Sequence, residues 1–293
     1  MANIEDVYKK LIDLTNELVE LQTIGIVGQS TEAKQDLMIN ELQNPTDFIY
    51  QIAEGQRAGY TAWNKFGYNP DIDAANQEVI WSHSNGWSYL TTASTLDIVS
   101  TSANDTLLGT GARTLFVSGI NENKLPVTET VELDGLNPVT TQHQYFGINR
   151  IGITSSGSLN INDDAITAAV TGTPANLQAE IPLGAGVTQQ AIFFIPAGHI
   201  FEANWLWANV ARTVGNQIPT VTIYMYHYSY ITNTKREIFR AKIDGSVSNT
   251  VDVHPPQPFV IPEQGVIWVE ALTDKDDTEV SVRFSGILKD TNV

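Results

Sequence analysis

The sequence contains no cysteine, which excludes disulfide bonds, thiolate catalysis and metal sites with cysteine ligands. Basic residues are few, because 16 Lys and Arg stand against 33 Asp and Glu and give a net charge of −17. Such an excess repels phosphate backbones, so the composition argues against nucleic-acid binding. No apolar run reaches about 18 residues, and no membrane span is expected. The first ten residues, MANIEDVYKK, do not have the basic and then apolar pattern of a signal peptide.

Recognisable motifs of enzymes and metal sites are also lacking. The five histidines have no HExxH or HxH spacing, and the acidic stretch TDKDDTE (residues 273–279) does not follow the calcium-loop pattern. GxSxG, P-loop and GxGxxG motifs are missing, and LLGTGAR (residues 107–113) leads into a strand pattern rather than a helix. Nothing singles out a pair of carboxylates of the kind that glycosidases use. We therefore predict a protein that is not an enzyme and that holds no metal or cofactor.

The first segment carries apolar residues at alternating spacings of three and four, the pattern of a coiled-coil seam. The seam consists of Ile4, Val7, Leu11, Leu14, Leu18 and Leu21. A helix of three heptads is marginally stable alone and needs a partner. We expect these six residues to mediate oligomerisation in a trimeric or hairpin-like bundle. The alternative is a helix that lies on the chain's own globular body. A second helix is expected over residues 31–43.

From about residue 76 the pattern changes to short runs rich in Val, Ile, Thr and aromatic residues, separated by Gly, Asn, Asp and Pro. Strands without crossover helices predict antiparallel sheets. We expect a mainly β fold: an antiparallel β-sandwich or jelly-roll-like C-terminal domain over residues 76–293, preceded by an α-helical, coiled-coil-like N-terminal segment over residues 1–45. Residues 46–75 are expected to be a connector, with a short helix near 47–57 that ends in a loop.

Two of the expected strands carry aromatic residues at alternate positions, which places each set on one face of a sheet. VTIYMYHYSYIT contains Tyr224, Tyr226, Tyr228 and Tyr230, and NWLWANV contains Trp205 and Trp207. Aromatic faces suit stacking on sugars, contact between subunits, and ordinary packing of a sheet. The sequence leaves these three alternatives open.

Four stretches form a distinctive set: SANDTLLGTGARTLFVSG (Ser102–Gly119), ETVELDGLNPVT (Glu129–Thr140), INR (Ile148–Arg150) and IFFIPAGHIFEANWLWANV (residues 192–210). Together they resemble virion structural proteins of tailed bacteriophages, often from marine phages. The resemblance covers residues 95–210, about half of the chain, and the N-terminal segment lies outside it. It implies a virion protein without catalysis, and leaves open whether the site of attachment is the head, the neck or the tail.

Resemblance and heptad pattern together predict a homotrimeric capsid decoration, head-fibre or tail-associated protein. Such a protein would be assembled in the host cytoplasm, would attach to capsid or tail proteins through its N-terminal helices, and would display its β domain. The alternative is a receptor-binding module of a tail fibre or spike that recognises host surface glycan through the two tryptophans and the four tyrosines.

Overall fold

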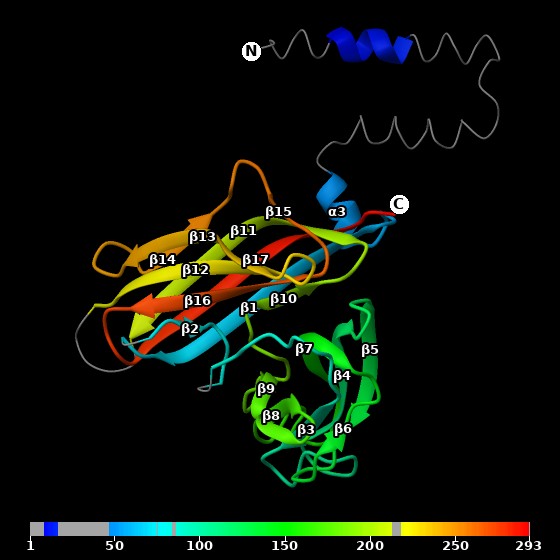
Figure 1. Ribbon diagram of the computed structural model, residues 1–293, viewed down its shortest axis with the longest axis vertical. Coiled ribbons are helices and arrows are strands. Elements are labelled where there is room, and N and C mark those ends of the chain that lie inside the picture. The colour runs from blue at the N-terminus through cyan, green and yellow to red at the C-terminus, as the bar shows by residue number, and fades with distance from the viewer. Residues whose placement is uncertain (1–8, 17–46, 75, 84–85, 213–217, 293) are drawn as a thin grey trace, which may run out of the picture. The chain divides into compact units, whose positions relative to one another are not determined.

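The computed structural model describes residues 9–16, 47–74, 76–83, 86–212 and 218–292 (Figure 1). The chain divides into two compact units, Met1–Arg57 and Ala58–Val293, which we call unit 1 and unit 2. The described part of unit 1 contains a helix over residues 9–16 and helix α3 (Asp47–Ala53). Over the described ranges, no helix has the length and apolar character needed to cross a membrane.

The coiled-coil-like N-terminal segment is a prediction that the structure contradicts. Only two short helices occur in the described part of unit 1, and no stretch of described helix there is as long as three heptads. Leu11 and Leu14 lie on the helix over residues 9–16 and are 38% and 56% exposed. Apolar spacing gives a helix an apolar face, but the length of a stable helix depends on what packs against that face. The other four seam residues and the helix expected over 31–43 lie outside the described residues.

In the described part of unit 2, the strands form four antiparallel sheets. Sheet I has the order β1 (Tyr60–Ile72), β17 (Thr278–Asp290), β11 (His199–Arg212) and β14 (Thr250–Val253), with β15 (Phe259–Ile261) also paired to β11. Sheet II has the order β10 (Ile192–Ile195), β16 (Gly265–Thr273), β12 (Thr220–Ser229) and β13 (Thr234–Asp244), with β2 (Glu78–Val79) on β16.

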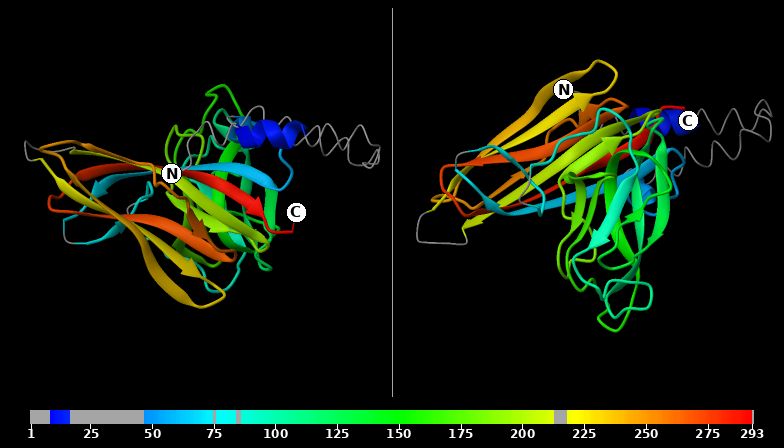
Figure 2. Two further views of the ribbon diagram at one scale, coloured as in Figure 1. Left: turned by 90° about the horizontal axis from the view of Figure 1, so that it is seen from above. Right: turned by 60° about the horizontal axis from the view of Figure 1, so that its bottom comes forward.

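The other two sheets come from the stretch between β2 and β10. Sheet III has the order β6 (Val139–Thr140), β3 (Leu96–Ser100), β8 (Ile166–Val170) and β9 (Thr173–Ile181). Sheet IV has the order β5 (Pro126–Glu132), β4 (Ala112–Asn121) and β7 (Tyr145–Ser156). Residues 96–181 are therefore an insertion between strands of the first two sheets, and Figures 1 and 2 show them as a separate group of strands.

Among the residues that the structure describes, three apolar cores hold these sheets together. The first lies between sheets I and II, where alternate residues of β12 and β17, such as Ile223 and Val282, are fully buried. The second lies between sheets III and IV and includes Leu115 of β4 and Ala168 of β8. The third joins the outer face of sheet II to the inserted sheets, and it is rich in aromatic residues. Sheets with one apolar face are stable only when that face is covered, and here each is covered by another sheet.

The prediction of a single jelly-roll-like domain over residues 76–293 is also wrong. Four separate sheets replace it, and β1 lies in the stretch that was expected to be a connector. β1 pairs along its length with β17 at the other end of the chain, so that Phe66 lies opposite Arg283. Pairing between strands so far apart in sequence leaves no trace in local periodicity, which is why the pattern alone did not separate the inserted sheets from the first pair.

Candidate functional site

The outer face of sheet I carries the two tryptophans. The strand registers place Phe66, Arg283, Trp207 and Asp252 side by side across β1, β17, β11 and β14. An extra residue in β11 between Ala203 and Trp205 shifts the alternation of that strand. Trp205 and Trp207 therefore point outward, while residues on both sides of the bulge enter the first core.

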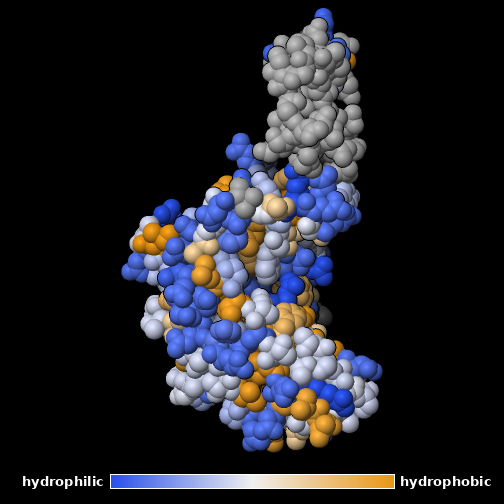
Figure 3. All heavy atoms as spheres, turned by 90° about the vertical axis from the view of Figure 1, so that its right-hand side faces the viewer, coloured by the Kyte–Doolittle hydropathy of each residue, from blue (hydrophilic) through white to orange (hydrophobic). Residues whose placement is uncertain are grey.

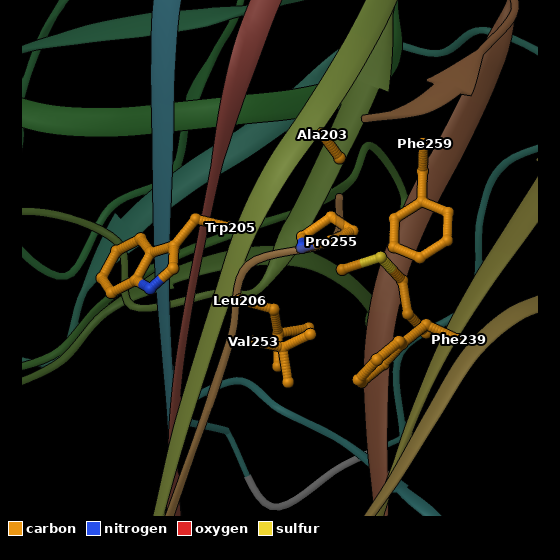
Figure 4. A pocket seen from close by; sticks show the side chains of 8 residues that line it. Ala203, Trp205, Leu206, Phe239, Val253, Pro255 and Phe259 are labelled. Carbon is orange, nitrogen blue, oxygen red and sulfur yellow. The ribbon is translucent and has the colours of Figure 1, made fainter. Parts of the chain in front are cut away.

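The tryptophans are half-buried and sit among polar groups. The Nε1 of Trp205 donates a hydrogen bond to Oδ1 of Asp252 at 2.6 Å, and the ring of His254 stacks on Trp205 with a centroid distance of 6.3 Å. Figure 4 shows Trp205, Phe239 and Phe259 among the residues that line an apolar gap at the first core, with the Trp205 ring on the other side of the β11 ribbon from the two phenylalanines. The arrangement offers indole faces next to a guanidinium and a carboxylate, a combination that suits a sugar or a protein partner.

The tyrosine row lies on the outer face of sheet II and is covered at one end by the same chain. Tyr228 is buried and stacks on Tyr89 at 4.1 Å, and Tyr230 meets Phe146 of β7 at 5.2 Å. Burial raises the pKa of Tyr230 well above its ordinary value. Trp87 lies over the same region, with its ring 5.9 Å from that of Trp268. This end of the row belongs to the core that joins sheet II to the inserted sheets.

The other end of the row is half-buried and is flanked by cations. The guanidinium of Arg240 lies over the Tyr224 ring at 4.8 Å, and the Nζ of Lys235 lies over the Tyr226 ring at 4.1 Å. Contacts of this kind stabilise an exposed aromatic ring by about 0.5–1 kcal/mol. The structure thus separates the six predicted aromatic contact residues. Tyr228 and Tyr230 pack inside the chain, whereas Trp205 and Trp207 lie on an outer sheet face.

The stretch that begins at Ser102 forms a loop built around one buried carboxylate. Oδ1 of Asp105 accepts hydrogen bonds from the backbone N–H groups of Ala112 at 2.7 Å and Asp163 at 2.9 Å, and Oδ2 accepts one from the Ser100 hydroxyl at 2.6 Å. A Cβ atom at Gly111 would lie 2.1 Å from Oδ1 of Asp105. The aspartate and the glycine of this motif therefore hold the loop over residues 101–111 in place against the segment at Asp163.

The INR stretch forms a joint between sheet IV and the first sheet pair. The side-chain amide of Asn149 exchanges two hydrogen bonds with the backbone of Phe194 in β10, at 2.7 and 3.0 Å. Arg150 donates to the carbonyl of Asn64 in β1 at 2.9 Å, and the buried Lys65 donates to the carbonyl of Asn149. Burial lowers the pKa of Lys65 well below its usual value, and the nearby Arg150 lowers it further. Two of the four distinctive stretches thus meet at this joint.

The acidic residues do not assemble a metal site within the described ranges, where no group of three or more candidate ligands is found. A polar cavity of about 520 Å³ is lined by Glu78, Glu270 and other residues. Both carboxylates already accept hydrogen bonds. Glu78 receives one from the backbone N–H of Asp73 at 2.9 Å, and Glu270 receives one from the Nε1 of Trp268 at 2.5 Å.

A second cavity, of about 230 Å³, lies at the end of sheet II, and no sequence motif indicates it. His227 lines it and is only 5% exposed, and its Nε2 has no hydrogen-bond partner among the described residues. Arg236 lines it from the neighbouring strand, directly opposite His227. A lone histidine in a strand is usually structural, and only the register of β12 against β13 reveals its charged neighbour.

No family model matches the sequence, and no curated protein matches it either. Among solved structures, a T=1 particle derived from infectious bursal virus is 11% identical over 80% of this chain and 70% of its own, with a TM-score of 0.22. A VP2 subviral particle of infectious bursal disease virus is 9% identical over 84% of this chain and 78% of its own, with a TM-score of 0.21. TM-scores of this size do not indicate a shared fold.

Proposed function

We propose that this chain is a non-enzymatic structural component of a bacteriophage virion, either a capsid decoration or head-fibre protein or a tail-associated protein. The observation that carries the proposal is the role of the residues that give the resemblance. Asp105 and Gly111 fix loops, and Asn149 joins two sheets. Side chains that are used for hydrogen bonds within the fold are typical of an architectural family rather than of a reaction.

Unit 1 is the part that we propose to attach to the particle. Its described helices expose apolar side chains, among them Leu14 at 56%, Ile49 at 62% and Tyr50 at 69%. Exposed apolar residues on short helices are stabilised when a partner covers them. The partners are capsid or tail proteins and further copies of this chain. For a homotrimer, light scattering would give about three times the monomer mass of 32.2 kDa.

Unit 2 is the part that we propose to be displayed. The face in Figure 3 carries many hydrophilic residues, with hydrophobic ones scattered between them. The loops that Asp105 and its neighbours fix expose leucines, including Leu108 and Leu136. A net charge of −17 keeps many closely spaced copies soluble. These features suit a protein that stands on a particle surface in many copies.

Deletion of residues 1–57 from the gene of the phage that encodes this chain tests the assignment of unit 1. We expect a protein with strand-rich circular dichroism that is missing from purified particles. Full-length protein with Trp207→Ala is the control and should be incorporated normally. Incorporation of the deleted form at the level of the full chain would contradict attachment through unit 1.

Receptor binding through glycan is the second candidate function, and the row that contains Trp207, Arg283 and Asp252 favours it. An indole face stacks on the apolar face of a sugar ring, and the neighbouring charged groups can bind its hydroxyls. Binding to a glycan array that is lost with Trp207→Ala, and kept with Tyr228→Phe, would support this function. Loss with neither variant, or binding to no glycan, would exclude the tryptophan surface as the receptor site.

A further inference from the structure

The outer face of sheet I carries a row of four side chains that crosses four strands. Phe66 of β1 lies beside Arg283 of β17. Arg283 lies beside Trp207 of β11, and Trp207 lies beside Asp252 of β14. We propose that this row binds an extended, neutral polysaccharide chain of the β-1,4-linked type. The inference rests on the glycan-binding function proposed above and names the ligand class for the same surface.

The row is accessible from solvent. Arg283 and Asp252 are exposed, and the side chains of Phe66 and Trp207 are half-buried. Alternate residues of a strand face opposite sides of a sheet, so the neighbouring residues Phe284 and Ala208 enter the first core while the row faces away from it. The aromatic rings can therefore contact a ligand without any change in the core.

The two aromatic residues of the row lie two strands apart, with β17 between them. Neighbouring strands are about 4.8 Å apart, so the backbone positions of Phe66 and Trp207 are separated by roughly 10 Å. This spacing exceeds the length of one sugar ring and is comparable with two linked rings. The apolar faces of sugar rings stack on aromatic side chains. The row therefore fits a chain of linked sugars better than a single sugar.

The polar groups of the row match the hydroxyl groups of a sugar chain. The Arg283 guanidinium lies 5.3 Å from the centroid of the Phe66 ring, and no ion pair of Arg283 is found in the described part of the chain. Oδ1 of Asp252 accepts the hydrogen bond from Trp205 and lies 3.3 Å from Nε2 of His254. A guanidinium donates to hydroxyl oxygens, and a carboxylate accepts from hydroxyl groups. A ligand along the row thus finds a donor between the rings and an acceptor beyond the second ring.

Charge and shape select the ligand class. The net charge of −17 repels acidic polysaccharides, and the row itself has no net charge, because it contains one arginine and one aspartate. A neutral polymer is therefore favoured. The equatorial bonds of a β-1,4-linked chain keep it extended, so successive rings can lie along the row. The axial bond of α-1,4-linked glucose curves the chain and carries later rings away from the sheet.

The row also has a purely structural interpretation. Side chains that face each other on neighbouring strands stabilise a sheet, and a guanidinium over an aromatic ring adds to this. The two roles predict different results. A row that only stabilises the sheet gives no saturable binding of a saccharide. A row that binds a chain gives an affinity that depends on the linkage, on the length of the chain and on both aromatic rings.

The test is a calorimetric titration of the full-length protein with three neutral β-1,4-linked hexasaccharides: cellohexaose, xylohexaose and chitohexaose. We expect at least one of them to bind with a Kd below about 1 mM. Maltohexaose has the composition of cellohexaose and differs only in linkage. It should bind at least about tenfold more weakly than the best of the three. The disaccharide of the best ligand should lose a similar factor, because it cannot extend over both rings.

Substitutions test the two rings separately. Trp207→Ala and Phe66→Ala should each weaken binding of the best hexasaccharide at least about fivefold. Phe48→Ala is the matched control, because Phe48 of α3 also has an arginine over its ring, with the Arg57 guanidinium 5.1 Å from the centroid. This control should change the affinity less than about twofold. Circular dichroism and denaturant titration show whether each variant is folded.

The proposal is overturned if none of the three hexasaccharides binds at concentrations up to about 10 mM. It is also overturned if maltohexaose binds as tightly as the best of them, or if Phe66→Ala and Phe48→Ala weaken binding equally. The comparisons of linkage and length use the unmodified protein, so they decide the claim even where a substitution unfolds the chain.

The outcome also separates this inference from the glycan function on which it rests. Compact glycans that bind on an array and are lost with Trp207→Ala, without binding of any hexasaccharide, would keep the glycan function and contradict the extended ligand. Binding of no saccharide at all would contradict both.

Discussion

The outer faces of sheets I and II carry the same sequence signal and have different surroundings. On sheet II, Tyr228 and Tyr230 are covered by aromatic residues from the segment before β3 and from β7. On sheet I, Trp205 and Trp207 lie half-buried on an outer face, and the groups that contact Trp205 there, Asp252 and His254, are polar. Aromatic residues at alternate positions therefore identify a sheet face, and what covers that face depends on chain segments far away in sequence.

Because one face is covered and the other is not, we expect the tyrosine row of sheet II to contribute to stability and the tryptophans of sheet I to contribute to recognition. A covered aromatic row contributes to the free energy of unfolding, because its removal leaves a cavity. An aromatic pair on an outer face contributes less to folding and is free to contribute to binding, where aromatic residues are enriched. Substitutions on the two faces should consequently differ in the size and in the kind of their effects.

Trp87→Ala should have the largest effect. The Trp87 ring is buried against Phe194 and Trp268, and it meets Tyr89, the residue that stacks on Tyr228. We expect a loss of about 4 kcal/mol in the free energy of unfolding, as for other large aromatic residues in cores, measured by denaturant titration. A loss below about 1 kcal/mol would mean that Trp87 is not packed in the core that joins sheet II to the inserted sheets.

Tyr228→Phe tests whether the covered row also uses its polar atoms inside the chain. The hydroxyl of Tyr228 donates a hydrogen bond to the side chain of Asn233 in the turn after β12. Its removal should lower the free energy of unfolding by about 1 kcal/mol, and Asn233→Ala combined with it in a double-mutant cycle should show coupling. Additive losses would indicate that the two side chains do not interact.

A pH titration of stability tests the burial of His227 on the inner face of β12. Burial lowers the pKa of His227 on the inner face, and the charge of Arg236 lowers it further. The unfolded chain therefore binds a proton more readily. This contribution to stability is fully present above the ordinary pKa of about 6.5 and is lost as the pH falls through the lower pKa of the folded state. The free energy of unfolding of the unmodified protein should fall more steeply below pH 6.5 than that of His227→Gln, and parallel curves would contradict the burial of a neutral imidazole.

Trp207→Ala should have the smallest effect on stability. The side chain lies on the outer face of sheet I, beside the exposed Arg283. We expect a change of about 1 kcal/mol or less in the free energy of unfolding, since this substitution leaves no closed cavity. A loss as large as that of Trp87→Ala would show that the tryptophan surface is covered in the isolated chain and would remove the contrast between the faces.

Local patterns predicted antiparallel strands and the direction of the aromatic side chains, but not the sheets that the strands form. β1 is the clearest example. Its inward positions include Lys65, Gly67 and Asn69, while Phe66 and Tyr68 face outward, so its pattern does not resemble that of a core strand. Its partner β17 is more than two hundred residues away in sequence. Only the completed pairing makes this stretch a strand.

Local sequence patterns also fail to predict the candidate sites, because these sites depend on how the strands pair. The bulge before Trp205 changes which residues of β11 face outward, and no glycine or proline at Asn204 announces it. His227 and Arg236 become neighbours through the register of two strands joined by a turn, and a one-residue shift would separate them. The heptad spacing around Leu11 correctly predicts helix over residues 9–16, but the spacing alone does not determine what packs against the apolar face of that helix.

The most direct test of the central proposal, that this chain is a structural part of a bacteriophage virion, is quantitative mass spectrometry of gradient-purified particles of the phage that, on this proposal, encodes it. The account predicts a constant number of copies per particle, in a fixed ratio to the major capsid protein across independent preparations. A chain that is found in the lysate of infected cells and is absent from the purified particles would contradict the account.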